Sequence, residues 1–171
     1  LKALSIEHKI GIHACPTCVM SYGEESGAIG YLVGEENKGI QCMFTMMNNA
    51  RLTVGLQGVS VSERAYQQAL SFCNERVQGV APGFKEPGPI IRHPDVQRML
   101  ANMKSITQGS RALTYAACAE VDYSLSNLPL ENLEMHERRL GFLTPIVKGW
   151  CTETAQAVSY THLTLPTMLW V

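Results

Sequence analysis

Two cysteines, Cys15 and Cys18, stand three positions apart and form the one closely spaced pair among six cysteines. A Cys-x-x-Cys pair can act as a redox dithiol or as half of a zinc site. No second Cys-x-x-Cys and no His-x-x-x-His follows, so no metal site is predicted. The pair lies in a short extended stretch with Pro16 inside rather than at a helix start, which favours two ordinary reduced thiols in a β segment. A thiol-redox or zinc module is a minor alternative.

The remaining cysteines fall within helical patterns, where we expect them to act as small core hydrophobes; they are Cys42, Cys73, Cys118 and Cys151. Reduced thiols are typical of the cytoplasm, which is the expected location. The formal net charge of −1 gives no electrostatic reason to expect nucleic acid or an anionic membrane as the main partner. No apolar run approaches the roughly 20 residues that span a bilayer. The chain begins at Leu1, without an initiator Met or a signal-peptide core, and we expect it to be part of a longer protein.

The elements that must position any site change in character near Lys38. Residues 1–36 consist of short apolar pieces, such as 10–12 and 28–33, with a turn-like stretch at 21–27 between them, and this predicts strands. From Lys38 onward, apolar and small residues recur every three to four positions, which predicts a helix over residues 40–77. Its expected buried face consists of Val54, Gly58, Val61, Ala65, Ala69 and Phe72. The small residues on this face would let a neighbouring helix come close.

Residues 80–91 are rich in Pro and Gly and predict a loop. His93-Pro94-Asp95 predicts a helix start, because Pro fits the first helical position and Asp complements the helix dipole there; the helical period then continues to about residue 122. Thr144-Pro145 predicts a third helix start. Its expected face consists of Ile146, Val147, Trp150 and Thr154. The expected fold class is therefore mainly α, an antiparallel helical bundle preceded by a β remnant.

Residues 158–171 end the helical pattern with a run of Thr and β-branched residues. Residues 158–167 can be encoded by GTC TCT TAT ACA CAT CTG ACG CTG CCG ACG, which resembles the transposon end and primer site of tagmented DNA libraries. We hypothesise that 158–171 is a translated adapter and not native sequence. A genuine C-terminal strand is the alternative, and the codons in the parent DNA decide between the two.

Motifs along residues 5–157 together resemble the acyl-CoA dehydrogenase family. They are GYLVGEENKG at 30–39, MFTMMNNAR at 43–51, GLQG at 55–58, ERAYQQAL at 63–70 and ERVQG at 75–79. IEHKIGI at 6–12 and the proline-rich insert before IRHP at 91–94 resemble the branch that contains 3-methylmercaptopropionyl-CoA dehydrogenase.

The resemblance implies a fold with an N-terminal helical domain, a middle β domain and a C-terminal four-helix domain, assembled as a homodimer or homotetramer. Residues 1–36 would be the end of the β domain, and residues 37–157 would be a partial C-terminal domain. The implied reaction is FAD-dependent α,β-dehydrogenation of an acyl-CoA thioester. A carboxylate removes the α-proton, the β-hydrogen passes to the flavin as hydride, and the electrons leave to an electron-transfer flavoprotein or similar acceptor.

The same resemblance implies three contacts to FAD. Arg76 and Gln78 match the family's Arg-x-Thr/Gln position, whose side chains reach the FAD pyrophosphate of the neighbouring subunit. A guanidinium pairs well with phosphate oxygens, whereas the plain alternative is a solvated Arg that interacts favourably with a helix C-terminus. His93 matches the His of a His-Gln pair near that FAD, but Pro94 replaces the Gln.

On the substrate side, Arg51 matches an Arg at the active-site side of the long helix, and Asn48 matches an Asp that some relatives place near CoA. Helix packing or capping is the alternative role for both. Relatives supply the catalytic Glu from a downstream segment or from the position before this Arg, which is Ala50 here. Glu63 and Glu153 lack motif support. We therefore expect no catalytic base in this chain, and neither tight FAD binding nor turnover by the chain alone.

A non-catalytic helical interaction module is the alternative function. The small-residue helix faces and the missing base support it. A parent gene that continues with an H-G-G-x-G-like segment and a downstream Glu would favour the enzyme instead.

Overall fold

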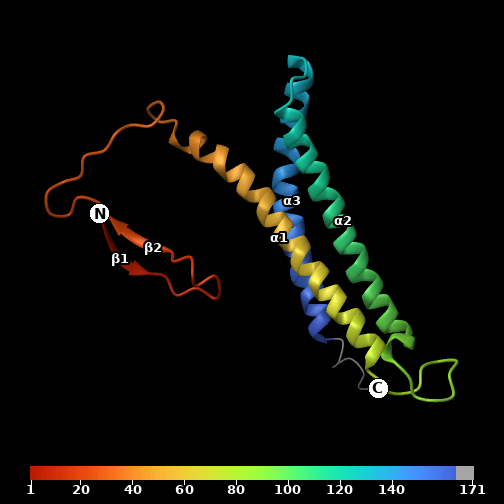
Figure 1. The fold of residues 1–171 in the computed structure, drawn as a ribbon. Helices are drawn as coiled ribbons and strands as arrows, with labels where there is room; N and C mark the ends of the chain where they lie inside the picture. The colour runs from red at the N-terminus through yellow and green to blue at the C-terminus, as the bar shows by residue number, and fades with distance from the viewer. Residues whose placement is uncertain (165–171) are drawn as a thin grey trace. The chain divides into compact units, whose positions relative to one another are not determined.

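The computed structural model describes residues 1–164 (Figure 1). The chain forms two compact units, of which the first is Leu1–Cys42 and the second begins at Met43. The strands are β1 (Lys2–Ile6) and β2 (Cys18–Ser21). Three long helices follow, and their bounds are α1 (Gly39–Glu75), α2 (Pro94–Ser124) and α3 (Leu130–Thr164), with a short 3₁₀ helix, η1 (Ile90–Arg92), before α2. This mainly helical architecture confirms the expected fold class.

The first unit contains one antiparallel pair of strands. β1 and β2 pair from Lys2↔Ser21 to Ile6↔Cys18, and the register shifts between Ala3 and Ser5. The other two strands expected here, at 10–12 and 28–33, do not form. Ile12 has a φ of 54°, a left-handed conformation that cannot continue a strand. Residues 28–33 pair with no strand among residues 1–164, so their backbone makes no inter-strand hydrogen bonds there.

All six cysteines are free thiols. Cys73 and Cys151 are buried as expected, whereas Cys42 and Cys118 are exposed, so the prediction of a core role was wrong for these two. The helical period alone does not show which helical positions face a neighbouring helix. Cys18 begins β2 and Cys15 is exposed in the preceding turn. Within residues 1–164, no three His, Cys, Asp or Glu side chains gather closely enough to hold a metal.

The buried side of α1 carries mostly small residues. It consists of Leu52, Gly55, Gly58, Val59, Ser62, Ala65, Ala69 and Cys73. Gly58, Ala65 and Ala69 were predicted correctly, but Val61 and Phe72 are 52% and 38% exposed. A helical period of three to four residues cannot tell whether a given position or the next one along the chain faces the core. In the structure the smaller residues Ser62 and Cys73 are buried in place of their neighbours Val61 and Phe72. Large side chains at those places would hold the helices apart.

The helix that comes close to this small-residue face is α3. A Cβ on Gly58 would overlap the carbonyl oxygen of Cys151 and lie 2.9 Å from its carbonyl carbon. A Cβ on Gly55 would overlap the Val147 side chain. The expectation of a closely packed neighbouring helix is confirmed, and the two backbones meet almost directly.

α2 follows its prediction. Pro94 occupies its first turn after His93, and Asp95 adds a negative charge there. The face predicted from the period is buried or half-buried throughout, since Ile106, Leu113 and Val121 pack at the edges of the two core clusters. Its fully buried residues are Val96, Met99, Leu100, Met103, Thr107, Ser110, Thr114 and Ala117.

α3 starts at Leu130 and contains Pro145 in its interior, so the predicted helix start at Thr144-Pro145 was wrong. Proline costs one backbone hydrogen bond inside a helix. Here its side chain is exposed, and Leu140 and Leu143 of the first half pack against the core, which offsets that cost. The predicted face was also misplaced, because Trp150 is 53% exposed. The buried positions are Thr144, Val147, Cys151, Ala155 and Val158.

The helix continues through the start of the segment expected to leave the bundle. Val158 is 1% exposed and belongs to a core cluster shared with α1, η1 and α2. The expected end of the helical pattern at this residue was therefore wrong, because burial of Val158 outweighs the weak helix propensity of the Thr and β-branched residues beside it. Residues 165–171 of the expected adapter lie outside the described residues.

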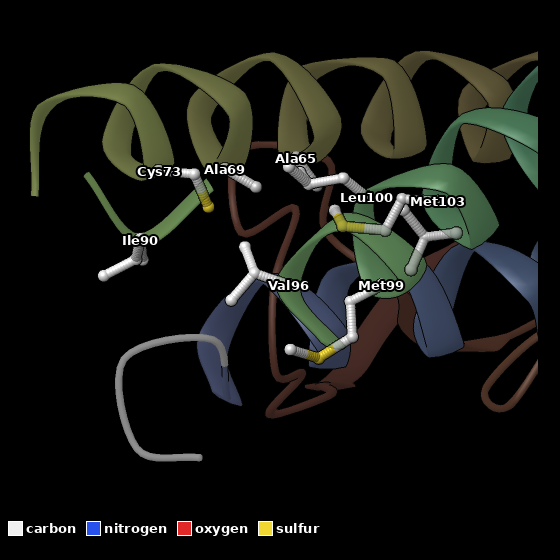
Figure 2. Packing of buried hydrophobic residues seen from close by; sticks show 9 residues of the cluster. Ala65, Ala69, Cys73, Ile90, Val96, Met99, Leu100 and Met103 are labelled. Carbon is white, nitrogen blue, oxygen red and sulfur yellow. The ribbon is translucent and has the colours of Figure 1, made fainter. Parts of the chain in front are cut away.

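The core brings the end of α1 against the start of α2. In Figure 2, Ala65, Ala69 and Cys73 project from α1 toward α2, where Val96, Met99, Leu100 and Met103 meet them, with Ile90 beside Cys73. Ile90 and Cys73 are both completely buried. This packing fixes the two chain segments that carry Arg76, Gln78 and His93.

No helix within residues 1–164 has the length and apolar character that a bilayer crossing requires.

Candidate functional site

The chain leaving α1 doubles back to meet the start of η1. Ile90 donates its N–H to the carbonyl of Arg76 at 2.8 Å, and Gln78 donates to the carbonyl of Gly88 at 3.2 Å. Val77 and Pro89 form an isolated antiparallel bridge. Residues 76–79 and 88–90 therefore make a short two-stranded closure, called the neck below, which shuts off the proline-rich loop.

The neck brings together the three residues that were predicted to contact FAD. Arg76 Nη2 donates to Gln78 Oε1 at 3.3 Å. The Nε2 atom of His93 lies 3.1 Å from the carbonyl oxygen of Gln78. Because a carbonyl oxygen can only accept, Nε2 carries the proton in this contact. We call Arg76, Gln78 and His93 the neck cluster. Gln78 and His93 are 15 positions apart in the sequence, and the chain reversal between them brings them into contact.

The charge of the neck cluster is positive and accessible. Arg76 is exposed, and Gln78 and His93 are half-buried. Within residues 1–164, no carboxylate lies within ion-pair distance of Arg76, whereas Arg98 and Arg111 each pair with one. An exposed guanidinium that no carboxylate neutralises fits a phosphate group, because two of its N–H groups can bond two phosphate oxygens at once. The neck cluster could therefore hold a phosphate group.

Sequence reasoning missed one cation beside the neck. The guanidinium of Arg92 lies 4.5 Å from the centre of the Phe84 ring. Gly88 packs against the same guanidinium so closely that a Cβ there would lie 2.9 Å from Nε. The available signal was an aromatic residue inside the Pro- and Gly-rich loop, Phe84, and an Arg directly after it.

The two residues predicted on the substrate side lie toward the other end of α1. The helical rise of about 1.5 Å per residue separates Arg51 from Arg76 by about 37 Å, so the two predicted sites are distinct. Arg51 is half-buried and its guanidinium lies 5.4 Å from the Phe44 ring centre. Asn48 is exposed.

Arg51 lines an open hollow of about 570 Å³ between α1 and α3, whereas Asn48 does not. The walls are formed by Met47, Ala50, Arg51, Val54, Pro145, Lys148 and Gly149. The hollow thus combines apolar walls with two cations and has no acidic side chain. Lys148 is a second cation that the sequence did not single out. Ala50 presents a methyl group at the position where some relatives carry the catalytic Glu.

Comparison with known proteins identifies the family of the chain. Residues 37–163 match the family model described as acyl-CoA dehydrogenase, C-terminal domain. The chain belongs to the acyl-CoA dehydrogenase family. The match covers α1 and α2 completely and α3 up to residue 163, which is six residues beyond Ala157.

Several relatives share this similarity. The chain is 47% identical over 161 residues to 3-methylmercaptopropionyl-CoA dehydrogenase of Ruegeria pomeroyi. The matched region covers 93% of this chain and 27% of that protein. It is 36% identical over 159 residues to a butyryl-CoA dehydrogenase of Syntrophomonas wolfei, covering 88% and 26%. It is 32% identical over 166 residues to the broad-specificity linear acyl-CoA dehydrogenase FadE5 of Mycobacterium tuberculosis, covering 90% and 26%. The chain spans about a quarter of the length of these relatives.

Proposed function

We propose that this chain is part of an FAD-dependent acyl-CoA dehydrogenase, which forms an α,β double bond in an acyl-CoA thioester. The neck cluster carries the proposal, because an exposed Arg, a Gln and a His from separate segments converge on one small surface. When bound, FAD would supply the flavin ring that serves as hydride acceptor in this reaction. Membership of the acyl-CoA dehydrogenase family supports this chemistry.

Each residue of the neck cluster has its own part in binding FAD. The Arg76 guanidinium would pair with the pyrophosphate oxygens, and the Gln78 side chain, which accepts from Arg76 Nη2, limits the orientations of that guanidinium. His93 holds the Gln78 carbonyl and so keeps the neck in place. In a homodimer or homotetramer, the FAD that these residues contact would be held mainly by the neighbouring subunit.

The hollow beside Arg51 is the proposed substrate side of this chain. Its apolar walls suit an acyl chain, and Arg51 suits the polar thioester or CoA portion; Asn48 contributes from the exposed side of α1. The 47% identity to 3-methylmercaptopropionyl-CoA dehydrogenase supports a short thioether acyl group as the substrate. An electron-transfer flavoprotein or similar acceptor would take the electrons. Six free thiols fit a cytoplasmic location.

Proton abstraction needs a carboxylate that this chain does not place beside the hollow. Ala50 cannot accept a proton, and the lining residues include no Asp or Glu. We therefore propose that the 171-residue chain alone has no dehydrogenase activity and binds FAD weakly at most.

Titration of the chain with inorganic pyrophosphate tests the proposal at the neck cluster. Amide and imidazole chemical shifts of Gln78 and His93 should move on addition of pyrophosphate. Replacement of Arg76 by Gln should weaken binding about tenfold or more, because one charge-assisted pair is lost. Arg98→Gln is the matched control, since Arg98 is equally an exposed helix-associated Arg but already pairs with Asp95. Acyl-CoA turnover should be absent throughout.

Two results would contradict the proposal. Pyrophosphate binding that Arg76→Gln leaves unchanged would remove the neck cluster from any FAD site. Because the site is expected to bind weakly, the titration extends to millimolar pyrophosphate. No shift of the Gln78 and His93 resonances at that concentration would favour the non-catalytic helical interaction module.

A further inference from the structure

We propose that Arg92 is a positioning residue for the phosphate site, because it clamps the proline-rich loop closed and so holds the neck cluster together. The inference rests on the proposed function of that cluster. Arg92 does not belong to the cluster and acts on it through Gly88 and Phe84.

The clamp has two contacts. The Arg92 guanidinium lies 4.5 Å from the centre of the Phe84 ring, which is a cation–π contact. The second contact is between the Arg92 guanidinium and Gly88. It is possible because Gly88 has no side chain, since a Cβ there would overlap Arg92 Nη1 and lie 2.6 Å from Cζ. Gly88 does not have a positive φ, so backbone conformation does not require glycine at this position. Room for Arg92 is what this glycine supplies.

The clamp is connected directly to the neck cluster. Gly88 accepts the hydrogen bond from the Gln78 N–H at 3.2 Å and donates to the Gly79 carbonyl at 3.4 Å. At its other end, Arg92 closes η1 and is followed at once by His93, whose ring contacts the Gln78 carbonyl. Arg92 therefore links the segment that holds the Gln78 backbone to the segment that supplies His93.

The chemistry favours Arg over Lys in this position. A planar guanidinium can stack on an aromatic face and pass close to a backbone at the same time, whereas a compact ammonium group cannot. Within residues 1–164, no ion pair joins Arg92 to a carboxylate. The stacking contact and the fit against Gly88 therefore carry the role.

Hydrogen exchange and pyrophosphate binding by the full chain test the clamp. We expect Arg92→Lys and Phe84→Leu to increase the exchange rate of the Gln78 amide and to shift the His93 Nε2 resonance. Phe84→Leu should weaken pyrophosphate binding about three- to fivefold, as expected for loss of one partly exposed cation–π contact. Arg92→Lys keeps the charge but loses the planar stack on the ring, and it should weaken binding in the same direction. Phe84→Tyr keeps an aromatic face and should restore the values of the unmodified chain, and Arg98→Lys is the control away from the loop.

A double-mutant cycle gives a second, independent readout. Gly88→Ala should weaken pyrophosphate binding when Arg92 is present, because the new methyl group displaces the guanidinium. In an Arg92→Ala background the same change should have no further effect. Thermal unfolding of each variant shows whether the chain is still folded when these values are compared.

The outcomes separate this inference from the function it rests on. Unchanged Gln78 exchange and pyrophosphate affinity in Arg92→Lys and Phe84→Leu would overturn the role of Arg92 alone. Additive effects of Gly88→Ala and Arg92→Ala would overturn it as well. Failure of the unmodified chain to bind pyrophosphate would overturn the phosphate site, and the clamp proposal with it.

Discussion

At the scale of single residues, Glu63 and Arg111 join α1 to α2. Arg111 Nη2 donates to Glu63 Oε2 at 2.6 Å, and Gln67 Nε2 donates to Glu63 Oε1 at 2.8 Å. The two charged side chains are about one-quarter exposed, at 27% and 28%. The hydrogen bond from Arg111, followed by that from Gln67, lowers the pKa of the Glu63 carboxyl below its ordinary value. Both bonds stabilise the ionised form.

This lowered pKa has a definite consequence for stability. A carboxyl whose pKa is lower in the folded state stabilises the fold above the unfolded-state pKa, and loses this contribution as pH falls through the folded value. Glu63→Gln should therefore reduce the free energy of unfolding by about 1 kcal/mol at pH 7. The difference from the unmodified chain should shrink below about pH 4. Urea unfolding across pH measures it, with exposed Glu137→Gln as control; a pH-independent difference would contradict the mechanism.

The individual residues of the neck cluster could be named from motifs, but their contacts could not. Arg76, Gln78 and His93 were identified from a resemblance to the family. The hydrogen bond between His93 and the Gln78 carbonyl depends on how the loop closes, and a loop rich in Pro and Gly has no periodicity that predicts closure. Arg92 escaped prediction for the same reason, since its partners Phe84 and Gly88 are defined by the loop conformation.

At the scale of elements, the contact between α1 and α3 depends on glycine. Gly58→Ala should destabilise the chain by about 1–3 kcal/mol, because the added methyl group meets the Cys151 backbone and only a shift of a whole helix can make room. Gly109→Ala on α2 is the matched control. A Cβ at Gly109 meets no atom within 4 Å, so this change should stabilise by about 0.5–1 kcal/mol through helix propensity. Thermal unfolding decides, and equal signs for the two changes would contradict the close approach.

Most of the elements could be predicted from the sequence, and the errors have physical causes. The helical period placed α1 and α2 nearly correctly because both have a continuous small or apolar face. The start of α3 was misplaced because Thr-Pro favours a helix start locally, whereas packing of Leu140 and Leu143 carries the helix through Pro145. The strands expected at 10–12 and 28–33 needed partners, which local sequence does not reveal.

At the scale of the whole molecule, the end of α3 completes the core. Truncation of the chain after Ala157 should reduce the free energy of unfolding by about 1.5–3 kcal/mol relative to a chain that ends at Thr164, because Val158 fills the cluster formed by α1, η1 and α2. Denaturant unfolding of the two chains measures this. Equal stability would show that Val158 contributes no packing. Whether residues 158–171 are native is a separate prediction, which the codons of the parent DNA test.

Pro145 divides α3 into two halves that differ in burial. Pro145 has no N–H to give to the carbonyl of Gly141, so the hydrogen-bond ladder of the helix is interrupted there. Beyond the proline, Val147, Cys151, Ala155 and Val158 are buried, whereas residues 130–143 are exposed or half-buried throughout. Local opening free energies follow buried apolar contact, so we expect the backbone amides of residues 130–143 to exchange faster than those of the half of α3 beyond Pro145. The Thr-Pro pair that resembles a helix start thus marks the border between the sparsely buried half and the well-buried half of α3.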